Sequence, residues 1–314
     1  MRNLAIAIDF GASNLRVALV SQEGKILSKK KEETLKEGSS GTVITKQIVR
    51  LIHSLLEENK IKKVKGIGIS SIGPLNYKRG GPENSPNIPF AFVPLVQPLQ
   101  KEFSVPVLLY NDGNAAVLGE KQFGAGKNIQ NLVYVTISTG IGGGAIVDGK
   151  LLLGKGGNAA EVGHFIVDTH YNIPCTCGAG VGHWEGLASG RNIPRFFETW
   201  IKQQKKIVSF EAKEAKDIFE VAKNGDAAAL EFLEELAKIN GRAISNIIAG
   251  YDPELITLGG SVGLNNPKII LAGITKYIDH FLKSPKILIT KLGEDIVLLG
   301  AAALVFEKKL GRQR

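Results

Sequence analysis

Short apolar runs along the chain predict strands arranged in a repeated unit. At Leu4–Val20, two runs rich in aliphatic and β-branched residues flank a polar turn that contains glycine. A similar unit returns at residues 131–153, where a predicted strand at Leu132–Ile137 precedes a glycine-rich turn and a second strand that ends at Val147. Two copies of one strand–loop–strand device, about half a chain apart, predict two related α/β domains that face each other.

Between and after these units the apolar pattern becomes helical. Apolar residues recur at three- and four-residue spacing over Thr42–Asn59, Ala212–Ala222 and Ala227–Ala249, with acids and lysines between them. A buried strand is predicted at Val64–Ser71, and a final helix begins at Ile296. This alternation of strands and helices favours an α/β fold with mixed sheets.

Composition and charge narrow the class of protein. No stretch approaches the roughly 18 uninterrupted apolar residues of a membrane helix, so no membrane partner is expected. The first residues lack the features of a signal peptide, and we therefore expect a cytoplasmic protein. The net charge is +9, from 39 Lys and Arg against 30 Asp and Glu. Because the basic residues are scattered among acids without an aromatic stacking platform, an anionic substrate such as ATP or a Lys-rich surface explains the excess better than nucleic acid.

Three glycine-bearing loops follow predicted strands, at Asp9–Asn14, Ser138–Gly144 and Gly259–Gly263. Glycine lets backbone N–H groups approach phosphate oxygens closely. Each loop alone is more typical of an ordinary turn, whereas three in this order indicate phosphate binding. None matches the P-loop or the dinucleotide fingerprint, which disfavours a P-loop nucleotide-binding protein and a dehydrogenase.

A polar pair, Asn111 and Asp112, directly follows the predicted strand at Val105–Tyr110. A carboxylate at a strand end can accept the proton of a substrate hydroxyl while a neighbouring amide holds that hydroxyl in line. Taken in isolation, the pair is better explained as a helix cap, because both residue types are common there.

Thiol and imidazole side chains cluster in one segment, at His164, Cys175, Cys177 and His183. Two thiolates and two imidazoles complete a closed tetrahedral set, which suits structural zinc. Reduced cysteines without a metal are the alternative. Glu161 and Glu185 flank the ligands and could support them, cap helices, or accept hydrogen bonds from sugar hydroxyls.

In order and approximate spacing, these motifs resemble the ROK family of sugar kinases within the actin-like, hexokinase-type ATPase fold. The resemblance implies an α/β protein of two actin-like (ribonuclease H-like) domains, with mixed sheets flanked by helices and the active-site cleft between them. Residues 1–114 with 301–314 would form a small N-terminal domain that the C-terminal helix returns to. Residues 115–300 would form a larger domain with the zinc loop and the nucleotide site.

The resemblance also implies roles for individual residues. Asp112 would be the general base on the sugar 6-hydroxyl, and Asp9 would act on the phosphates through Mg²⁺ and water. The implied sugar ligands are Asn87, Asn111, Asp112, Glu161, His164 and Glu185. The residues implied at the phosphates are Gly11, Ala12, Ser13, Asn14, Thr139, Gly140, Gly142 and Gly143. Those implied near the nucleotide are Gly259, Gly260, Ser261 and the segment Gly300–Ala302.

The metal segment departs from the family pattern CxCGxxGC. His183 stands where the third cysteine is expected, with one extra residue before it. Because histidine is also a good zinc ligand, we keep a structural Zn²⁺ site with the ligands His164, Cys175, Cys177 and His183. His164 would use one ring nitrogen for zinc and turn the other toward the sugar.

The expected activity is ATP-dependent phosphorylation of a hexose at the 6-hydroxyl, with glucose as the first candidate. An N-acetylmannosamine or N-acetylglucosamine kinase and a catalytically silent sugar-binding regulator stay open as alternatives. Family repressors carry a winged-helix segment before the kinase-like part, and Asp9 stands too near the start of this sequence to accommodate one. The resemblance further implies ATP, Mg²⁺ and Zn²⁺ as cofactors and a homo-oligomer, either a dimer or a tetramer.

Overall fold

The structure is a computed structural model that describes residues 3–306, and the chain divides into two compact units. Unit 1 comprises the described residues up to Asn128, the segment Lys150–Gly157 and the described residues from Asp295 onward, and unit 2 comprises Ile129–Gly149 and Asn158–Glu294. Residues 115–128, 150–157 and 295–300, which the sequence-based division placed in the second domain, group with unit 1. Residues 307–314 of the predicted returning helix lie outside the described residues.

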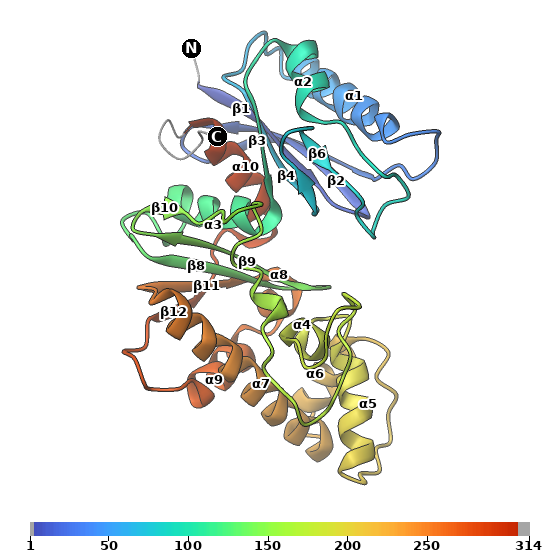
Figure 1. The fold of residues 1–314 in the computed structure, drawn as a ribbon, viewed down its shortest axis with the longest axis vertical. Coiled ribbons are helices and arrows are strands. Elements are labelled where there is room, and N and C mark those ends of the chain that lie inside the picture. Colours follow the sequence, from blue (N-terminus) through green and yellow to red (C-terminus); the bar gives the residue numbers. More distant parts are fainter. Residues whose placement is uncertain (1–2, 307–314) are drawn as a thin grey trace. The chain divides into compact units, whose positions relative to one another are not determined.

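Unit 1 is built on a five-stranded mixed sheet with the strand order β3-β2-β1-β4-β7 (Figure 1). Its strands are β1 (Leu4–Phe10), β2 (Asn14–Ser21), β3 (Ile26–Glu33), β4 (Ile67–Ser71) and β7 (Val107–Asn111). β1 pairs antiparallel with β2 and parallel with β4, which in turn pairs parallel with β7. The central strands β1 and β4 are almost wholly buried, as strands covered on both faces are, and Asp9, Ser70 and Ser71 are their only polar residues.

The helices of unit 1 supply the apolar surfaces that cover this sheet. They are α1 (Thr42–Glu58), α2 (Val96–Phe103), α3 (Asp112–Phe123) and α10 (Ile296–Phe306). α1 buries the apolar face that its spacing predicts, including Ile44, Ile48 and Leu55, in the same core as β1. Short strands β5 (Leu75–Asn76), β6 (Gly81–Pro82) and β10 (Lys150–Leu151) complete the unit.

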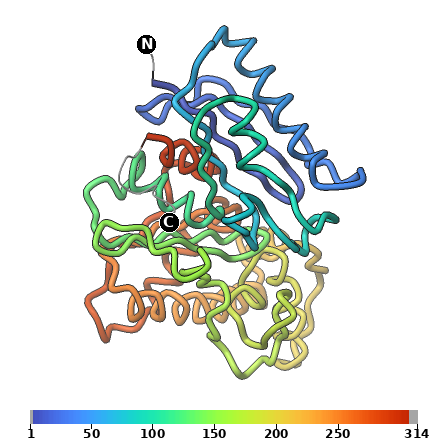
Figure 2. Tube along the Cα trace, turned by 45° about the horizontal axis from the view of Figure 1, so that its top comes forward, coloured from blue at the N-terminus to red at the C-terminus, as the bar shows by residue number. Residues whose placement is uncertain are grey.

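The last helix, α10, returns to the first strands of the chain and contacts both β1 and β4, as the red helix beside the blue strands shows in Figure 2. It also packs closely on α3, where Gly119 of α3 lies against the Ile296 carbonyl. A side chain on Gly300 would overlap the Ala115 carbonyl, and one on Gly68 would overlap that of Ala301. Gly300, Ala301 and Ala302 are therefore buried core residues where α10 packs on α3 and β4.

Unit 2 repeats the arrangement with strands in the order β9-β8-β11-β12. These strands are β8 (Leu132–Ile137), β9 (Ile141–Val147), β11 (Leu255–Gly259) and β12 (Lys286–Ile289). As β1 does in unit 1, β8 has an antiparallel neighbour that follows a glycine loop and a parallel neighbour on its other side. The predicted repeat and the predicted α/β class with mixed sheets are confirmed.

The helices of unit 2 are α4 (Trp184–Ala188), α5 (Ile193–Gln203), α6 (Ala215–Lys223), α7 (Ala227–Tyr251), α8 (Gly260–Asn265) and α9 (Pro267–Tyr277). Two 3₁₀ turns, η1 (Val162–His164) and η2 (Gly293–Asp295), lie in the connections. An aromatic cluster of Phe196, Phe197, Trp200 and Phe232 joins α5 to α7. This cluster gives unit 2 an apolar core of its own.

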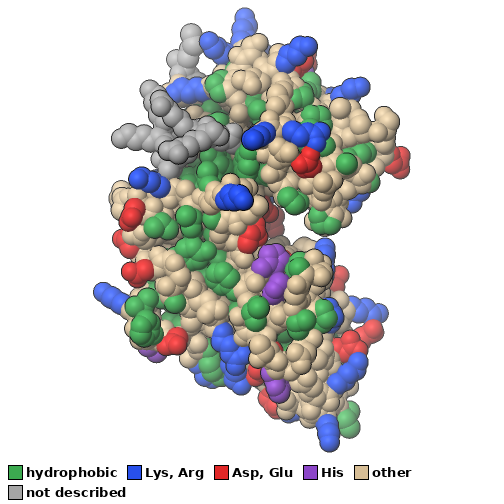
Figure 3. Space-filling model, viewed as in Figure 1, with side chains coloured by type: hydrophobic (Ala, Val, Ile, Leu, Met, Phe, Trp, Pro, Cys, Tyr) green, Lys and Arg blue, Asp and Glu red, His purple; other side chains and the backbone are tan. Residues whose placement is uncertain are grey.

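The surface agrees with the scattered charge of the sequence. Figure 3 shows basic side chains interspersed with acidic ones over the face it draws. Within residues 3–306, no helix is both long enough and apolar enough to cross a membrane.

Candidate active site and metal cluster

Asp9 lies near the end of β1, where the first glycine loop begins, and is held by Arg16. The antiparallel register places Arg16 directly opposite Asp9, so that Nε and Nη2 of Arg16 both reach Oδ2 of Asp9, at 2.8 and 2.7 Å. Burial raises the pKa of Asp9 above its usual value, and the Arg16 guanidinium partly opposes this effect. The two bonds fix the orientation of the carboxylate.

Arg16 also links Asp9 to the chain segment that precedes α10. Its Nη1 donates to Oδ1 of Asp295 at 3.3 Å, and Lys29 Nζ donates to both oxygens of Asp295 at 2.7 and 2.8 Å. Asp295 is the residue at which the chain re-enters unit 1. The predicted phosphate loop is thereby tied to a residue 279 positions away in the sequence.

The first glycine loop is a tight turn closed by its own backbone. Gly11 N donates to the Asn14 carbonyl at 3.0 Å, and Thr34 Oγ1 donates to the Gly11 carbonyl at 2.7 Å. A Cβ on Gly11 would lie 2.9 Å from the Asn14 oxygen, which explains the glycine. Ala12 and Ser13 form the tip of the turn, where Ser13 is exposed.

Asn111 and Asp112 stand at the junction of β7 and α3. Asn111 Oδ1 accepts from Asn114 N at 2.8 Å, so the predicted helix cap is confirmed. Asp112, the first residue of α3, accepts from Gly113 N at 2.8 Å and remains open to solvent, whereas Asn111 is buried. Although the residue is exposed, the protein atoms packed around its carboxylate reduce hydration and raise the pKa of Asp112; the Gly113 bond opposes this effect and the Asp9 charge adds to it. An accessible carboxylate with a raised pKa suits a general base.

Asn87 lies in the connection between β6 and α2, and its side chain is exposed. The stretch from Pro74 to Pro98 is rich in proline, a composition that favours a loop. The structure instead forms β5, β6 and the start of α2 within this segment. Asn87 itself stays in the irregular part.

The second and third glycine loops come together in unit 2. β8 pairs parallel with β11, which places Gly259 opposite Thr136, and Ser138 Oγ lies 3.1 Å from Ser261 Oγ. Gly260 has a φ of +80°, a conformation that favours glycine, and a side chain there would crowd the Ile137 carbonyl. The two loops form one continuous wall, as parallel neighbouring strands require.

A cavity of about 640 Å³ opens beside this wall, entirely within unit 2. Thr139 and Ser261 contribute from the two loops, and α6 forms the opposite side with Phe219. Four basic residues, Arg191, Lys213, Lys216 and Lys223, line the cavity against two acidic ones, Glu214 and Glu220, so its lining carries a net positive charge. The cavity is of the size that proteins use for small organic ligands, and its lining favours an anionic one.

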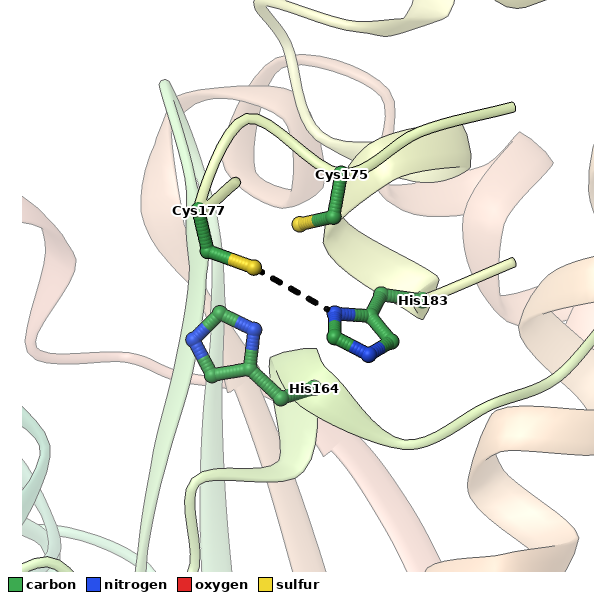
Figure 4. Close-up of side chains that lie close together, drawn as sticks. All are labelled: His164, Cys175, Cys177 and His183. Atoms are coloured by element: carbon green, nitrogen blue, oxygen red, sulfur yellow. Dashed lines mark hydrogen bonds between the residues drawn. The ribbon is translucent and has the colours of Figure 1, made fainter. Parts of the chain in front are cut away.

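The four predicted zinc ligands meet in one cluster (Figure 4). The ligand atoms of His164, Cys175, Cys177 and His183 all lie within 4.8 Å of one another. Cys177 Sγ and His183 Nδ1 are 3.5 Å apart. Tetrahedral zinc with bonds of about 2.3 Å to sulfur and about 2.0 Å to nitrogen requires a sulfur–nitrogen separation of about 3.5 Å. The donor set and its spacing therefore fit zinc.

The loop accommodates His183 in place of a third cysteine by folding back on itself. Pro174 pairs with Val181, and Ile166 pairs with His183, through isolated β-bridges. Gly178 and Gly182 adopt positive φ at the two bends, so the extra residue before His183 is absorbed in the turn. Burial and the neighbouring His164 lower the pKa of His183, which favours the neutral, metal-binding imidazole.

Sequence comparison places the chain among known proteins. A sequence profile described as ROK family matches residues 5–308. The chain belongs to the ROK family. It is 36% identical to a glucokinase of Pyrobaculum calidifontis, over 98% of this chain and 99% of that protein. A glucokinase of Thermotoga maritima is 35% identical over 96% of this chain and 97% of its own length.

A solved ROK structure shares the fold. The ROK family glucokinase from Streptomyces griseus, in complex with glucose and AMPPNP, superposes with a TM-score of 0.77 at 30% identity. The match covers 96% of this chain and 99% of that one.

The two predicted glutamates of this ROK chain occupy different settings. Glu161 is the exposed residue that precedes η1, the turn that carries His164. Glu185 lies in α4, where Oε2 accepts from Ile141 N at 2.9 Å and Oε1 from Thr176 Oγ1 at 3.3 Å. Glu185 thus contacts both the second glycine loop and the metal loop.

Sequence reasoning did not include Arg16 and Asp295, which the structure connects to Asp9, among the candidate site residues. Arg16 could have been found, because a two-stranded antiparallel register about the predicted turn pairs it with Asp9. Asp295 could not have been found in this way, since no sequence pattern around it predicts a contact with β2. Asn192, which bonds to Glu185 and Thr176, lacks such a signal for the same reason.

Proposed function

We propose that this ROK chain transfers the γ-phosphoryl group of Mg-ATP to the 6-hydroxyl of a hexose, with glucose as the preferred acceptor. The single observation that carries the proposal is Asp112, an accessible carboxylate with a raised pKa at the start of α3. Full-length similarity to glucokinases supports glucose over other hexoses.

On the acceptor side, Asp112 takes the proton of the attacking hydroxyl. The raised pKa makes the ionised Asp112 carboxylate a stronger base for that proton. We assign the remaining sugar hydroxyls to Asn87, Asn111, Glu161, His164 and Glu185. These side chains offer the amide, carboxylate and imidazole groups that sugar hydroxyls bind.

On the donor side, the phosphates would contact the backbone of the turn from Gly11 to Asn14 and that from Thr139 to Gly143. Asp9 would hold Mg²⁺, directly or through water, because carboxylate oxygen is a ligand that Mg²⁺ prefers. When bound, the ion neutralises charge on the transferring phosphoryl group. Arg16 contributes by fixing the Asp9 carboxylate in one orientation.

We assign the nucleoside part of the donor to the cavity between the glycine-loop wall and α6. Gly259, Gly260 and Ser261 line or adjoin it, and its four basic side chains match the charge of a nucleotide. A polyphosphate donor has no base or ribose to fill this cavity. The cavity therefore favours ATP over polyphosphate.

The zinc proposal is separate from the chemical step. The cluster of His164, Cys175, Cys177 and His183 would hold Zn²⁺ with four protein ligands and no open position, which is typical of structural zinc. Its contribution would be to order the loop that carries His164. Metal analysis of the purified protein tests this, and a protein that neither contains nor takes up zinc contradicts it.

Release of ADP with a panel of sugars tests the activity. Glucose should give the highest kcat/KM, and N-acetylmannosamine, N-acetylglucosamine and mannose should give lower values. Polyphosphate in place of ATP should support little turnover. No ADP release with any sugar, from a protein that still binds glucose, would instead identify a catalytically silent regulator.

A further inference from the structure

α4 lies between the metal loop and the second glycine loop and touches both. Through the Glu185 side chain, one carboxylate oxygen accepts from Ile141 N at 2.9 Å, and the other accepts from Thr176 Oγ1 at 3.3 Å. Thr176 is the residue between the two cysteines of the metal cluster. One carboxylate therefore connects the Cys175–Cys177 segment to the turn that begins β9.

The chain just after α4 adds two backbone contacts to the same glycine loop. Gly190 N donates to the Ser138 carbonyl at 2.6 Å, and Arg191 N donates to that of Thr139 at 3.4 Å. A Cβ on Gly190 would lie 2.9 Å from the Ser138 oxygen, so the approach is close. The glycine loop rests on α4 and its C-terminal extension over its whole length from Ser138 to Ile141.

Asn192 connects α4 to the metal loop through hydrogen bonds of its side-chain amide. Its Nδ2 lies 3.0 Å from the Glu185 carbonyl, 2.9 Å from Ser189 Oγ and 3.4 Å from Thr176 Oγ1. Asn192 is 2% exposed and its bond to Ser189 is buried, whereas its bonds to the Glu185 carbonyl and to the exposed Thr176 are partly buried. Both Thr176 and the backbone of α4 are held by this one buried amide.

α4 itself is a rigid support. Trp184 has no exposed surface, and its Nε1 donates to Asn240 Oδ1 in α7 at 2.8 Å. On the neighbouring turn, Gly186 packs against the backbone of Cys175, where a Cβ would lie 3.1 Å from Cys175 Cα. A short helix fixed in this way transmits a restraint from one loop to the other instead of absorbing it.

We propose that metal binding at the cluster orders the second glycine loop through Thr176 and Glu185, and so strengthens binding of the donor nucleotide before any sugar is present. This inference rests on the proposed function of that loop as a phosphate site. A metal ion fixes Cys175 and Cys177 and therefore the Thr176 hydroxyl between them. The metal has then already reduced the conformational freedom of the Glu185 carboxylate and the Ile141 N–H. Nucleotide binding therefore costs less conformational entropy.

Coupling of this kind acts in both directions. If zinc tightens ADP, then ADP must tighten zinc by the same factor. Glu185 is a positioning residue in this coupling, separate from its proposed contact with sugar. Thr176 touches Glu185 and Asn192 but is assigned to neither substrate, so its substitution isolates the coupling.

The test is titration of ADP, without sugar, into zinc-loaded and chelator-stripped protein, for the wild type and Thr176→Val. Stripping should weaken ADP binding to the wild type by about tenfold. In loaded protein, Thr176→Val should weaken it by roughly threefold while zinc content stays at the wild-type level. In stripped protein the same substitution should have no further effect on ADP affinity, because without the metal Thr176 is no longer fixed.

Thr169→Val is the matched control, since Thr169 is an exposed threonine in the same segment of the chain. It should leave ADP affinity unchanged in both forms. An ADP affinity that is identical with and without zinc, or a Thr176→Val effect that persists at full size after stripping, overturns the proposal.

Hydrogen exchange at the Ile141 amide gives a readout that needs no nucleotide. This amide should exchange more slowly in loaded than in stripped protein, with Thr176→Val intermediate. If the loaded wild type neither binds ADP nor phosphorylates a sugar, the proposed function fails while the Ile141 result still decides the coupling. If the protein binds no zinc, the metal proposal and this inference both fail, and the kinase assay stands independently.

Discussion

At the scale of single residues, Asp112 combines two roles that the sequence presents as alternatives. Asn111 caps α3 through its side chain, which places Asp112 in the first turn of the helix with its carboxylate open to solvent. By capping the helix, Asn111 positions Asp112, the proposed general base. A helix-cap interpretation and a catalytic interpretation therefore describe the same geometry.

Replacing Asp112 with Asn should remove the base and keep the shape. We expect kcat for glucose phosphorylation to fall by about a hundredfold or more. Asp148→Asn, in the exposed β9–β10 turn, serves as the control and should keep wild-type turnover. Near-normal turnover of the Asp112 variant would refute the assignment.

The raised pKa of Asp112 has consequences for pH. Only the ionised carboxylate accepts a proton, so kcat/KM should fall as pH drops through a pKa that lies above the ordinary aspartate value of 3.8. Ionisation also costs stability once pH exceeds the unfolded-state pKa, because the folded state holds the proton more tightly. Because Asp112 is exposed, water screens most of this cost, so Asp112→Asn should raise Tm only slightly at neutral pH and leave it unchanged at pH values below both pKa values. Thermal melts across pH, beside the kinetic profile, check both statements.

Arg16 is the residue that orients Asp9, and its loss should act on the donor. Arg16→Ala should raise KM for Mg-ATP by about tenfold, as removal of a group that supports a metal ligand does. Lys at this position restores charge without the paired Nε and Nη2 bonds, so Arg16→Lys should be intermediate. Lys29→Ala is the control, because Lys29 contacts Asp295 but is not bonded to Asp9 in the network. An equal effect on the KM of glucose would contradict a role specific to the donor.

At the scale of elements, the closest packing in unit 1 is the crossing of α3 and α10. Gly119 lies against the Ile296 carbonyl, and Gly300 against that of Ala115, so the two helix backbones nearly touch. α3 begins with Asp112 and α10 follows Asp295. Because glycines at the crossing carry no side chains, α3 and α10 pack closely together. Each helix has a candidate site residue at its N-terminal end.

Gly300→Ala should consequently destabilise the protein although alanine is the better helix former. The added methyl would overlap the Ala115 carbonyl, and overpacking of this kind costs about 1–3 kcal/mol or more. In α7, a methyl added to Gly250 would have no neighbouring atom within 4 Å, and Gly250→Ala should stabilise by about 0.5–1 kcal/mol. Urea unfolding of both variants measures the difference, and equal effects would argue against the packing explanation.

At the scale of the whole molecule, each unit contains its own sheet and its own apolar core. The metal cluster and the cavity assigned to the nucleoside belong to unit 2, whereas Asp9 and Asp112 belong to unit 1. A ligand that binds one unit therefore stabilises that unit first.

Removal of zinc should act on the two units unequally. Chelation should speed hydrogen exchange in residues 161–192 of unit 2, because the metal loop and the segment that follows α4 lose their anchor. The central strands β1 and β4 of unit 1 should keep their protection, since their buried core is independent of the cluster. Uniform loss of protection across both units would contradict this expectation. Cys175→Ser with Cys177→Ser should reproduce the chelated pattern.

Much of the fold was predictable because its signals are local. The strand–loop–strand repeat, the apolar face of α1 and the polar residues at strand ends follow from periodicities of two and 3.6 residues and from turn chemistry. α2 escaped prediction because prolines surround it, and α10 gave a weak guide to its surroundings because it is apolar on every side.

By itself, the sequence determined which residues have the chemistry: the glycine loops, Asp9, Asp112 and the four thiol and imidazole ligands. The tertiary structure decided which of them act together. Arg16 meets Asp295 across 279 positions, and Glu185 meets Ile141 across 44, through chain reversals that no local pattern encodes. Gly300 shows the same limit, since the sequence does not indicate that the Ala115 carbonyl of the neighbouring helix leaves no room for a side chain there. Side-chain chemistry is a property of the residue, whereas contact between distant residues is a property of the packed fold.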